Sequence, residues 1–341
     1  MIRAAYVGTN YMKDFTSDDA NMLDVINIAF GLVRENSLYF PENGVKTEFD
    51  RVRAASPDIK IILSVGGWGA GGFSHMASTE EGRLTFARSC RDVVDQYGFD
   101  GIDIDWEYPT KDWAGIDASP DDRENFTLML RELRRVLPES EGKLLTIAVG
   151  CGTYYPDCVE FEKIVPLLDY ISLMSYDMRG IGSTAGHHTG LYPTTGDENQ
   201  SSADTYVKLF TKCGVPAEKQ ILGAALYSRI WKGVPNAGVH GLGQAGSEGS
   251  GGFGPGYTEL KNDYINQNGY VLYRDNSAPF LYKAETGEFI SFDDPDSAYA
   301  KVNYILDNGL AGIMYWEHSC DKEREILKAI NQAVSDSKNR T

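Results

Sequence analysis

Three carboxylic side chains alternate with apolar ones in the segment FDGIDIDWEYP, residues 99–109. Residues two apart in a β-strand face the same side, so Asp103, Asp105 and Glu107 would form one row on a strand. Neighbours in this row lie about 6.6 Å apart along the backbone, at roughly 3.3 Å per residue. Three carboxylates this close in an apolar setting cannot all ionise cheaply, so we expect them to share protons and to hold at least one acid neutral. A neutral carboxylic acid is the group that general acid catalysis requires.

The apolar residues of the same segment give the strand a second face. Ile102, Ile104 and Trp106 point away from the carboxylates, as expected of a barrel strand with helices on one side and the interior on the other. Glu107 is last in the row and would lie nearest the mouth at the carboxyl ends of the strands, where barrel enzymes have their active sites. A solvated acidic strand and a calcium site are the alternatives. Both fit less well, because a solvated strand does not explain the alternating isoleucines and calcium ligands usually come from loops.

Eight short apolar runs could supply the strands of such a barrel. They are AAYVG, VINIAFGLV, KIILSVGG, GIDIDW, LLTIAVG, YISLMSY, ILGAALY and AGIMYW. Amphipathic stretches lie between several of them, at residues 80–96, 123–137, 203–212 and 297–308. Alternating strands and helices indicate a parallel sheet, and eight such units predict an α/β fold of the (β/α)8 TIM barrel type.

The repeat is interrupted between the seventh run, at residues 221–229, and the eighth, at 311–316. About eighty residues intervene, where a single helix is expected. They open with a glycine-rich loop at 241–256 and continue with the strand-like pieces GYVLYRD, PFLYK and GEFISFDD. We therefore expect a small α+β insertion domain between strands seven and eight, followed by the helix that leads to strand eight. The expected boundaries are 230–292 for the insertion domain and 1–229 with 293–341 for the barrel.

Composition restricts the class of protein further. With 341 residues, 42% of them hydrophobic, the chain can bury a sizeable core. Its formal net charge of −17 repels phosphate backbones and anionic membrane surfaces, so neither nucleic acid nor a membrane is an expected partner. No run approaches the roughly 20 apolar residues of a membrane span, and the N-terminal MIRAAYVGTN lacks the pattern of a signal peptide.

The five cysteines are odd in number and none has CxxC spacing, which predicts neither a disulfide framework nor a zinc site. This usage favours a reducing compartment such as the cytoplasm, although a secreted chain from which the signal had been removed would look the same. The adjacent His187 and His188 lack the spaced carboxylates of a ligand set, so we expect no metal and no cofactor.

The acidic segment DGIDIDWE resembles the DxxDxDxE signature of glycoside hydrolase family 18, the chitinase family. The resemblance covers nearly the whole chain. SVGGW (64–68) is similar to the family's SxGGW on strand three, and MSYD (174–177) to its MxYD on strand six. GAALYSR (223–229) is similar to Gly-x-Pro-x-Tyr-x-Arg, with Ala225 at the proline. GIMYWEHSCD supplies the tryptophan expected at the end of strand eight, and residues 280–312 are similar to the chitinase insertion domain and the helix after it.

This resemblance implies a retaining mechanism in which the substrate's own N-acetyl group is the nucleophile, an exception among retaining glycosidases. Glu107 would protonate the leaving oxygen and later act as base on water. Asp105 would accept a hydrogen bond from the acetamido N–H, and Asp103, deeper in the row, would exchange a proton or hydrogen bond with it. Tyr176 would orient the acetamido carbonyl through its hydroxyl, and Asp177 would bind a sugar hydroxyl beside it.

The same motifs indicate the residues that would bind the sugar chain. Trp316 would form the floor of the subsite for the distorted sugar, because sugar rings present C–H faces that stack on indoles. The wall of the cleft would comprise Tyr6, Phe30, Trp68, Tyr108, Met174, Tyr227 and Arg229. The first-strand segment carries one residue more than the family's usual motif, which leaves the correspondence of Tyr6 and Tyr11 open.

The expected substrate is chitin or a chito-oligosaccharide, hydrolysed at β-1,4-N-acetylglucosaminide bonds through an oxazolinium intermediate by a monomeric enzyme. An endo-β-N-acetylglucosaminidase acting on N-glycans and a peptidoglycan hydrolase of the same family are alternatives. The insertion domain and Trp316 favour chitin, since a deepened cleft suits a long linear chain. A non-catalytic chitin-binding lectin is the more remote alternative, because such lectins lose the acid that is Glu107 here.

Overall fold

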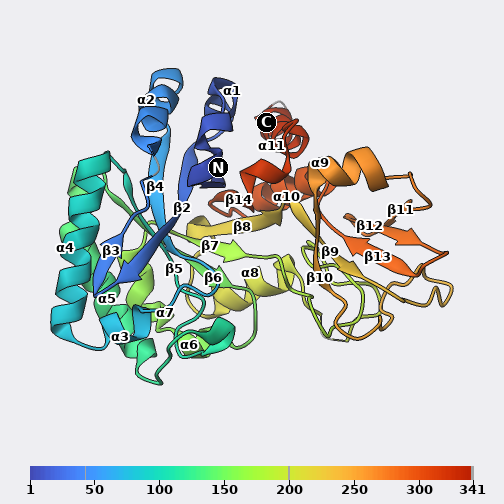
Figure 1. The fold of residues 1–341 in the computed structure, drawn as a ribbon, viewed down its shortest axis with the longest axis horizontal. Coiled ribbons are helices and arrows are strands. Elements are labelled where there is room, and N and C mark those ends of the chain that lie inside the picture. The colour runs from blue at the N-terminus through green and yellow to red at the C-terminus, as the bar shows by residue number, and fades with distance from the viewer. Residues whose placement is uncertain (43, 199, 339–341) are drawn as a thin grey trace. The chain divides into compact units, whose positions relative to one another are not determined.

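A computed structural model describes residues 1–42, 44–198 and 200–338 (Figure 1). The eight expected strands all form. They are β1 (Ile2–Gly8), β2 (Val25–Arg34), β4 (Lys60–Gly66), β5 (Gly101–Asp105), β6 (Leu144–Gly150), β7 (Tyr170–Met174), β8 (Gln220–Ala225) and β14 (Gly312–Trp316). One sheet contains them in the order β1-β14-β8-β7-β6-β5-β4-β2, and it closes because β1 also pairs with β2. The fold is the expected (β/α)8 TIM barrel, with β3 (Ser37–Tyr39) added antiparallel to β2.

The chain forms two compact units. The first unit consists of Ile2–Leu173 and Leu209–Ile221, and the second of Met174–Lys208 and the chain from Leu222 onwards, together with Met1. The helices that begin in the first unit are α1 (Ser17–Asn21), α2 (Val45–Ala55), α3 (Phe73–Ala77), α4 (Glu80–Tyr97), α5 (Asp122–Val136), α6 (Tyr155–Cys158) and α7 (Phe161–Ile164). Its 3-10 turns are η1 (Thr9–Asp14), η2 (Trp113–Gly115), η3 (Glu139–Glu141), η4 (Val165–Leu167) and η5 (Ala217–Lys219).

Local sequence signals account for helix α4, which lies beside α5 in Figure 1. At its start the Thr79 side chain accepts a hydrogen bond from the backbone N–H of Gly82. It ends at Gly98, whose φ of 74° is a left-handed conformation that glycine adopts without strain. Phe86 and Val94, eight residues apart, lie on its buried face. The amphipathic pattern is therefore what packs this helix onto the sheet.

The register of β5 separates its polar face from its apolar face, as predicted. Asp103 lies opposite Ser64 on β4 and Thr146 on β6. On the other face, directly after β5, Trp106 stacks on Phe73 of α3 with ring centroids 5.3 Å apart. The apolar row meets the helices and the carboxylate of Asp103 is fully buried inside the sheet.

The second unit contains a separate five-stranded sheet in the order β10-β9-β13-β12-β11, drawn in yellow to orange in Figure 1. Its strands are β9 (Tyr227–Trp231), β10 (Gly252–Gly256), β11 (Val271–Asp275), β12 (Ala278–Lys283) and β13 (Glu288–Ser291), and all printed pairings between them are antiparallel. A core of Trp231, Val234, Phe280, Tyr282, Phe289 and Ala185 packs within this unit. The remaining elements are α8 (Ala203–Lys212), α9 (Tyr257–Glu259), η6 (Leu260–Tyr264), α10 (Pro295–Asp307), η7 (His318–Cys320) and α11 (Glu325–Lys338).

The small sheet differs from expectation in two places. The single run at 221–229 divides, because β8 ends at Ala225 and Tyr227 begins β9 of the second sheet. The end of the glycine-rich segment 241–256 is strand β10 and not loop; a Cβ at Gly254 would crowd the Ser228 hydroxyl of β9, so glycine permits the close approach. The proposed domain boundary at residue 230 thus falls within β9, and the boundary at 292 follows β13.

All five cysteines are free thiols. No helix within the described ranges has both the length and the apolar character that a membrane span requires.

Candidate active site

Asp103 is a fully buried carboxylate in the first unit whose two oxygens both accept hydrogen bonds from hydroxyl groups. Oδ2 accepts from the Tyr6 hydroxyl at 2.9 Å and from Ser64 Oγ at 2.8 Å, and Oδ1 accepts from Thr146 Oγ1 at 2.7 Å. Burial raises the pKa of Asp103, and the three donors act against that rise because they favour the charged form. The two strands that flank β5, together with β1, therefore supply the hydrogen-bond donors for an anion at this position.

Asp105 is also buried, but among the described residues it lacks a comparable set of hydrogen-bond donors. It is 4% exposed, and its Oδ1 is buried without a hydrogen-bond partner among the described residues. Burial raises the pKa of Asp105 well above its usual range, and the charges of Glu107 and Asp103 raise it further. Of the two buried acids, Asp105 is thus the one that the surroundings favour in the neutral form, with an oxygen left available to a ligand.

Glu107 follows the end of β5 and is partly exposed, unlike the two aspartates. Its neighbour Tyr108 is 9% exposed, and burial, with the charge of Glu107 second, raises the tyrosine's pKa well above its ordinary value. Glu107 is therefore the member of the row that solvent or a substrate can reach, as its place in the sequence predicted.

Two glycines at the end of β4 hold this strand close to the acidic row. Gly66 and Gly67 have φ of 126° and 94°, and the N–H of Gly67 donates to the Asp105 carbonyl at 2.9 Å. A Cβ at Gly66 would overlap that carbonyl, and one at Gly67 would lie 2.9 Å from the ring of Phe30. The close approach that these glycines permit is to Asp105 and Phe30, so their role in the structure is to pack the site's wall.

Asp177 lies in the second unit, where it forms an ion pair with Arg229 and lies beside His188. Its Oδ1 accepts from Arg229 Nε at 2.7 Å and lies 3.5 Å from His188 Nδ1. Burial alone would raise the pKa of Asp177, but the hydrogen bonds and charges of these two partners hold it well below its usual range. Burial lowers the pKa of His188, so the permanent positive charge beside Asp177 is that of Arg229. Asp177 is consequently an anion at neutral pH.

Aromatic residues surround this ion pair within the second unit. Tyr227 contacts Tyr176 edge to face at 6.2 Å between ring centroids, and Arg229 lies 3.9 Å over the ring of Phe253. The Tyr176 hydroxyl lies 3.9 Å from the sulfur of Met314 on β14. Tyr176 thus stands between an aromatic ring of the small sheet and a thioether of the barrel strand.

The structure gathers the candidate residues into two groups, one in each unit. The first unit holds Tyr6, Phe30, Trp68, Asp103, Asp105, Glu107 and Tyr108. The second holds Met174, Tyr176, Asp177, Tyr227, Arg229 and Trp316. Met174 and Tyr227 are 8% and 7% exposed, whereas Trp316 is partly exposed at the end of β14. Of the two tyrosines in the first-strand segment, Tyr6 donates a hydrogen bond to Asp103, while Tyr11 is 44% exposed on η1.

Sequence reasoning missed several residues that contact the acids. Ser64 and Thr146 bind Asp103, and His188 lies against Asp177. Thr146 gave a signal, since it is the one polar residue in the apolar run LLTIAVG. His187 and His188 each lie beside an aspartate, and within the described part of the chain no three His, Cys, Asp or Glu side chains are grouped as metal ligands.

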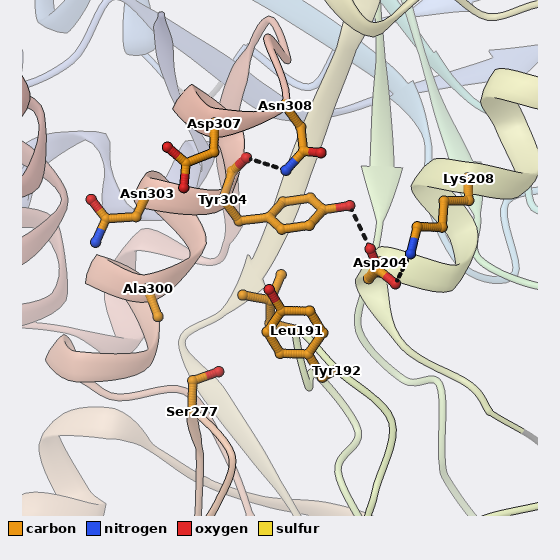
Figure 2. A pocket seen from close by; sticks show the side chains of 10 residues that line it. All are labelled: Leu191, Tyr192, Asp204, Lys208, Ser277, Ala300, Asn303, Tyr304, Asp307 and Asn308. Carbon is orange, nitrogen blue, oxygen red and sulfur yellow. Dashed lines mark hydrogen bonds and ion pairs between the residues drawn. The ribbon is translucent and has the colours of Figure 1, made fainter.

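A pocket of about 480 Å³ lies elsewhere, between α8 and α10 in the second unit (Figure 2). Tyr304 crosses it and donates a hydrogen bond to Asp204 at 2.9 Å, and Asp204 also binds Lys208 at 2.7 Å. Asn308 donates to the carbonyl of Tyr304 at 2.8 Å. None of the candidate residues lines this pocket, and Tyr304, Asp204 and Lys208 within it bind one another, so we assign it no chemistry.

Comparison with known proteins connects this geometry to a family. The family model described as "Glycosyl hydrolases family 18" matches residues 3–321. Chitinase A1 of Niallia circulans is 35% identical over 311 residues, which are 84% of this chain and 44% of that protein. Chitotriosidase-1 of Mus musculus is 31% identical over 337 residues, which are 90% of this chain and 69% of that protein.

A solved structure agrees over almost the full length of both chains. A glycoside hydrolase family 18 N-acetylglucosaminidase from Paenibacillus barengoltzii has a TM-score of 0.93 and 46% identity, covering 97% of this chain and 99% of the other. The resemblance inferred from the acidic segment is thereby confirmed. With a matching family model, a closed barrel and the acid row on its fourth strand, the chain belongs to family 18 of the glycosyl hydrolases, enzymes that cleave glycosidic bonds.

Proposed function

We propose that this chain is a retaining chitinase that hydrolyses β-1,4 bonds beside N-acetylglucosamine by substrate-assisted catalysis. One observation carries the proposal. Asp103 and Asp105 are two buried carboxylates in one row, but only Asp103 has donors on both oxygens, while Asp105 keeps a buried oxygen without a partner among the described residues. An unpaired buried acceptor with a raised pKa is suited to meet a ligand's N–H, which supports Asp105 as the acceptor for an acetamido group.

The steps follow from that assignment. Glu107 donates its proton to the glycosidic oxygen as the bond to C1 breaks, and the acetamido carbonyl oxygen forms a bond to C1 to give the oxazolinium ion. Asp105, whose proton passes to Asp103, accepts a hydrogen bond from the acetamido N–H, and its negative charge stabilises the positive charge of the oxazolinium ion. Water then attacks C1 and transfers a proton to Glu107, which restores the acid and the acetamide. Two displacements at C1 retain the β configuration.

The second unit supplies residues for binding by the same family motifs. Tyr176 is assigned to orient the acetamido carbonyl, Asp177 to bind a sugar hydroxyl, and Trp316 to stack on the distorted sugar. The ion pair with Arg229 supports a binding role for Asp177, because an aspartate kept ionised accepts hydrogen bonds and holds no proton to donate at neutral pH.

The test of the mechanism is the anomer of the first product. Chito-oligosaccharides of defined length are incubated with the protein and the new reducing end is followed by proton NMR before mutarotation. The β-anomer is expected, together with inhibition by a thiazoline analogue of the cyclic intermediate and no cleavage at a sugar whose acetamide is replaced by an amine. Trapping of a glycosyl ester on Asp103, Asp105 or Asp177 would refute the mechanism.

A second candidate is the release of single N-acetylglucosamine residues. It is favoured by the similarity to the Paenibacillus barengoltzii protein, which bears the name N-acetylglucosaminidase. The same time course separates the two, because release of monomer alone from every oligomer length supports the second candidate and early internal products support the first.

High-mannose glycopeptide and muropeptides, tested in parallel, address the two other substrate classes. Exhaustive chelation tests the expected independence from metal.

A further inference from the structure

Four aromatic residues of the first unit form a continuous group, here called the aromatic wall: Trp68, Tyr108, Trp113 and Tyr154. The Tyr108 ring contacts Trp68 at 6.4 Å, Trp113 at 6.0 Å and Tyr154 at 5.6 Å between centroids. Trp113 and Tyr154 lie edge to face at 4.7 Å. Trp68 is 64% exposed and Trp113 is 41% exposed, whereas Tyr108 is buried between them. Two exposed indoles that share one buried ring are an apolar surface for which the fold itself shows no need.

The buried ring of the wall is fixed beside the proton donor. Tyr108 follows Glu107 directly, and the charge of Glu107 contributes to the raised pKa of Tyr108. The wall is also seated firmly on β6 and the turn after it. A Cβ at Gly150 would overlap the Tyr154 hydroxyl, and one at Gly152 would overlap the same ring, so both glycines leave room for Tyr154.

A single carboxylate joins the two loops that carry the indoles. Asp117, in the loop after Trp113, accepts the N–H of Gly72 at 2.7 Å and of His75 at 2.8 Å, and both of these residues belong to the loop and helix that follow Trp68. Asp122 reinforces the junction, since its carboxylate accepts the hydroxyl of Ser74 at 2.6 Å. The position of Trp113 relative to Trp68 is therefore set by hydrogen bonds of the protein and does not depend on a ligand.

We propose that Trp113 is a sugar-binding platform, which stacks on a sugar ring of the bound oligosaccharide next to the ring that Trp68 would contact. The proposal rests on the proposed function, because the occupant is the chito-oligosaccharide substrate. Pyranose rings present apolar C–H faces, and an exposed indole held on a rigid support gives up little conformational freedom when it binds such a face. Asp117 is a positioning residue, which acts by holding the loop of Trp113.

The test compares hydrolysis of N-acetylglucosamine oligomers from the dimer to the hexamer by the wild type, Trp113→Ala and Trp113→Phe. For Trp113→Ala, kcat/KM is expected to fall about ten-fold on the longest oligomers, or about 1.4 kcal/mol, and to change little on the shortest. The loss should appear in KM, since the stacked sugar lies away from the reacting carbon. Trp113→Phe should recover most of the loss. Tyr192→Ala, which removes an aromatic of similar exposure (42%) in the second unit, should leave every length unaffected.

Asp117→Ala supplies a readout that a merely structural role would not give. It should reproduce the length-dependent rise in KM, and the double variant with Trp113→Ala should lose no more than Trp113→Ala alone, because both changes remove one interaction. Equal losses at all lengths for Trp113→Ala, or additive losses in the double variant, would overturn the proposal while leaving the chitinase assignment intact. Failure of the wild type to cleave any oligomer would overturn both together.

Discussion

Asp105 is 4% exposed and the Asp177 side chain is 36% exposed, and the surroundings of these two carboxylates shift their pKa values in opposite directions. Burial raises the pKa of Asp105, and repulsion from the charges of Glu107 and Asp103 raises it further. Burial would raise the pKa of Asp177, but the hydrogen bonds and charges of His188 and Arg229 hold it below the usual range. The comparison shows that one residue type takes two roles: a proton-sharing acid in the row and a fixed anion in the second unit.

The raised pKa of the buried acid Asp105 lowers the stability of the folded protein at neutral pH, whereas the ion pair of Asp177 and Arg229 raises it. A carboxyl group with a raised pKa in the folded state loses stability as pH rises above its unfolded value, about 3.9. One with a lowered pKa contributes stability above that value and loses it only as pH falls through the lower folded pKa. Residues that lower the stability of the folded protein at neutral pH, and that contribute no compensating contact, are characteristic of functional sites.

The largest effect is expected from Glu107→Gln, which removes the transferable proton and preserves shape. Turnover on chito-oligosaccharides should fall by about 10² to 10⁴-fold, while oligosaccharide binding measured by calorimetry persists. Glu81→Gln, at an exposed position on α4, is the matched control. Retention of more than about a tenth of wild-type turnover, equivalent to about 1.4 kcal/mol, would remove Glu107 from the mechanism.

Asp105→Asn should separate activity from stability. We expect turnover to fall about 10²-fold, because the neutral amide no longer stabilises a developing positive charge. We also expect the variant to be more stable than the wild type at pH 7, with the difference vanishing below about pH 4, where the wild-type acid is protonated in both states. Urea unfolding at both pH values measures this. A variant less stable at pH 7 would contradict the account of the row.

Asp177→Asn should lower stability at pH 7, the opposite of the effect expected for Asp105→Asn. Removing the anion leaves Arg229 largely buried without its carboxylate, and the loss should be about 1–2 kcal/mol at pH 7 once the solvent at the partly exposed Asp177 side chain is allowed for. The difference from wild type should shrink only as pH falls below about 3.9. Asp50→Asn on α2, an exposed position, serves as the control in the same urea titration. If the Asp105 and Asp177 variants changed stability in the same direction at pH 7, the proposed difference between the two carboxylates would be refuted.

The smallest effect is expected from Tyr6→Phe, which removes one of three hydroxyl donors to Asp103. The free energy of unfolding should fall by about 1 kcal/mol. Because the lost donor favours the charged form, the pKa of Asp103 should rise further and the acidic limb of the pH–rate profile should move to higher pH. Tyr97→Phe, which removes a hydroxyl that donates to Glu42 at 3.2 Å, away from the acid row, is the control. An unchanged or downward-shifted limb would show that Asp103 does not titrate with the row.

Much of the barrel and of the acid row could be predicted because the signals are local. Alternation with a period of two fixes which side chains of β5 share a face, and it correctly assigned Asp103 to the interior and Trp106 to the helices. The apolar runs located all eight strands, since each is buried and bounded by turn residues. The position of Glu107 at the end of the row followed from the same count.

The sequence pattern did not predict the strand boundary where one apolar run contributes to both sheets. Residues 221–227 form a continuous apolar stretch, but β8 ends at Ala225 and Tyr227 pairs within the small sheet, so the division depends on which strands the two halves pair with. The sequence did not predict strand β10 for a related reason. Its glycines carry no strand propensity, and it forms because they allow close pairing with β9.

The sequence by itself determined the fold class and the face of the acid row, and it singled out Glu107 as the proposed proton donor, because strand periodicity and residue type are properties of a short segment. Only the tertiary structure decided which carboxylate is cradled and which is left unpaired. The hydroxyls on Asp103 come from residues 97, 39 and 43 positions away, and the guanidinium on Asp177 from 52 positions away. The charge state of a buried acid depends on such neighbours, and chain folding alone brings them into contact.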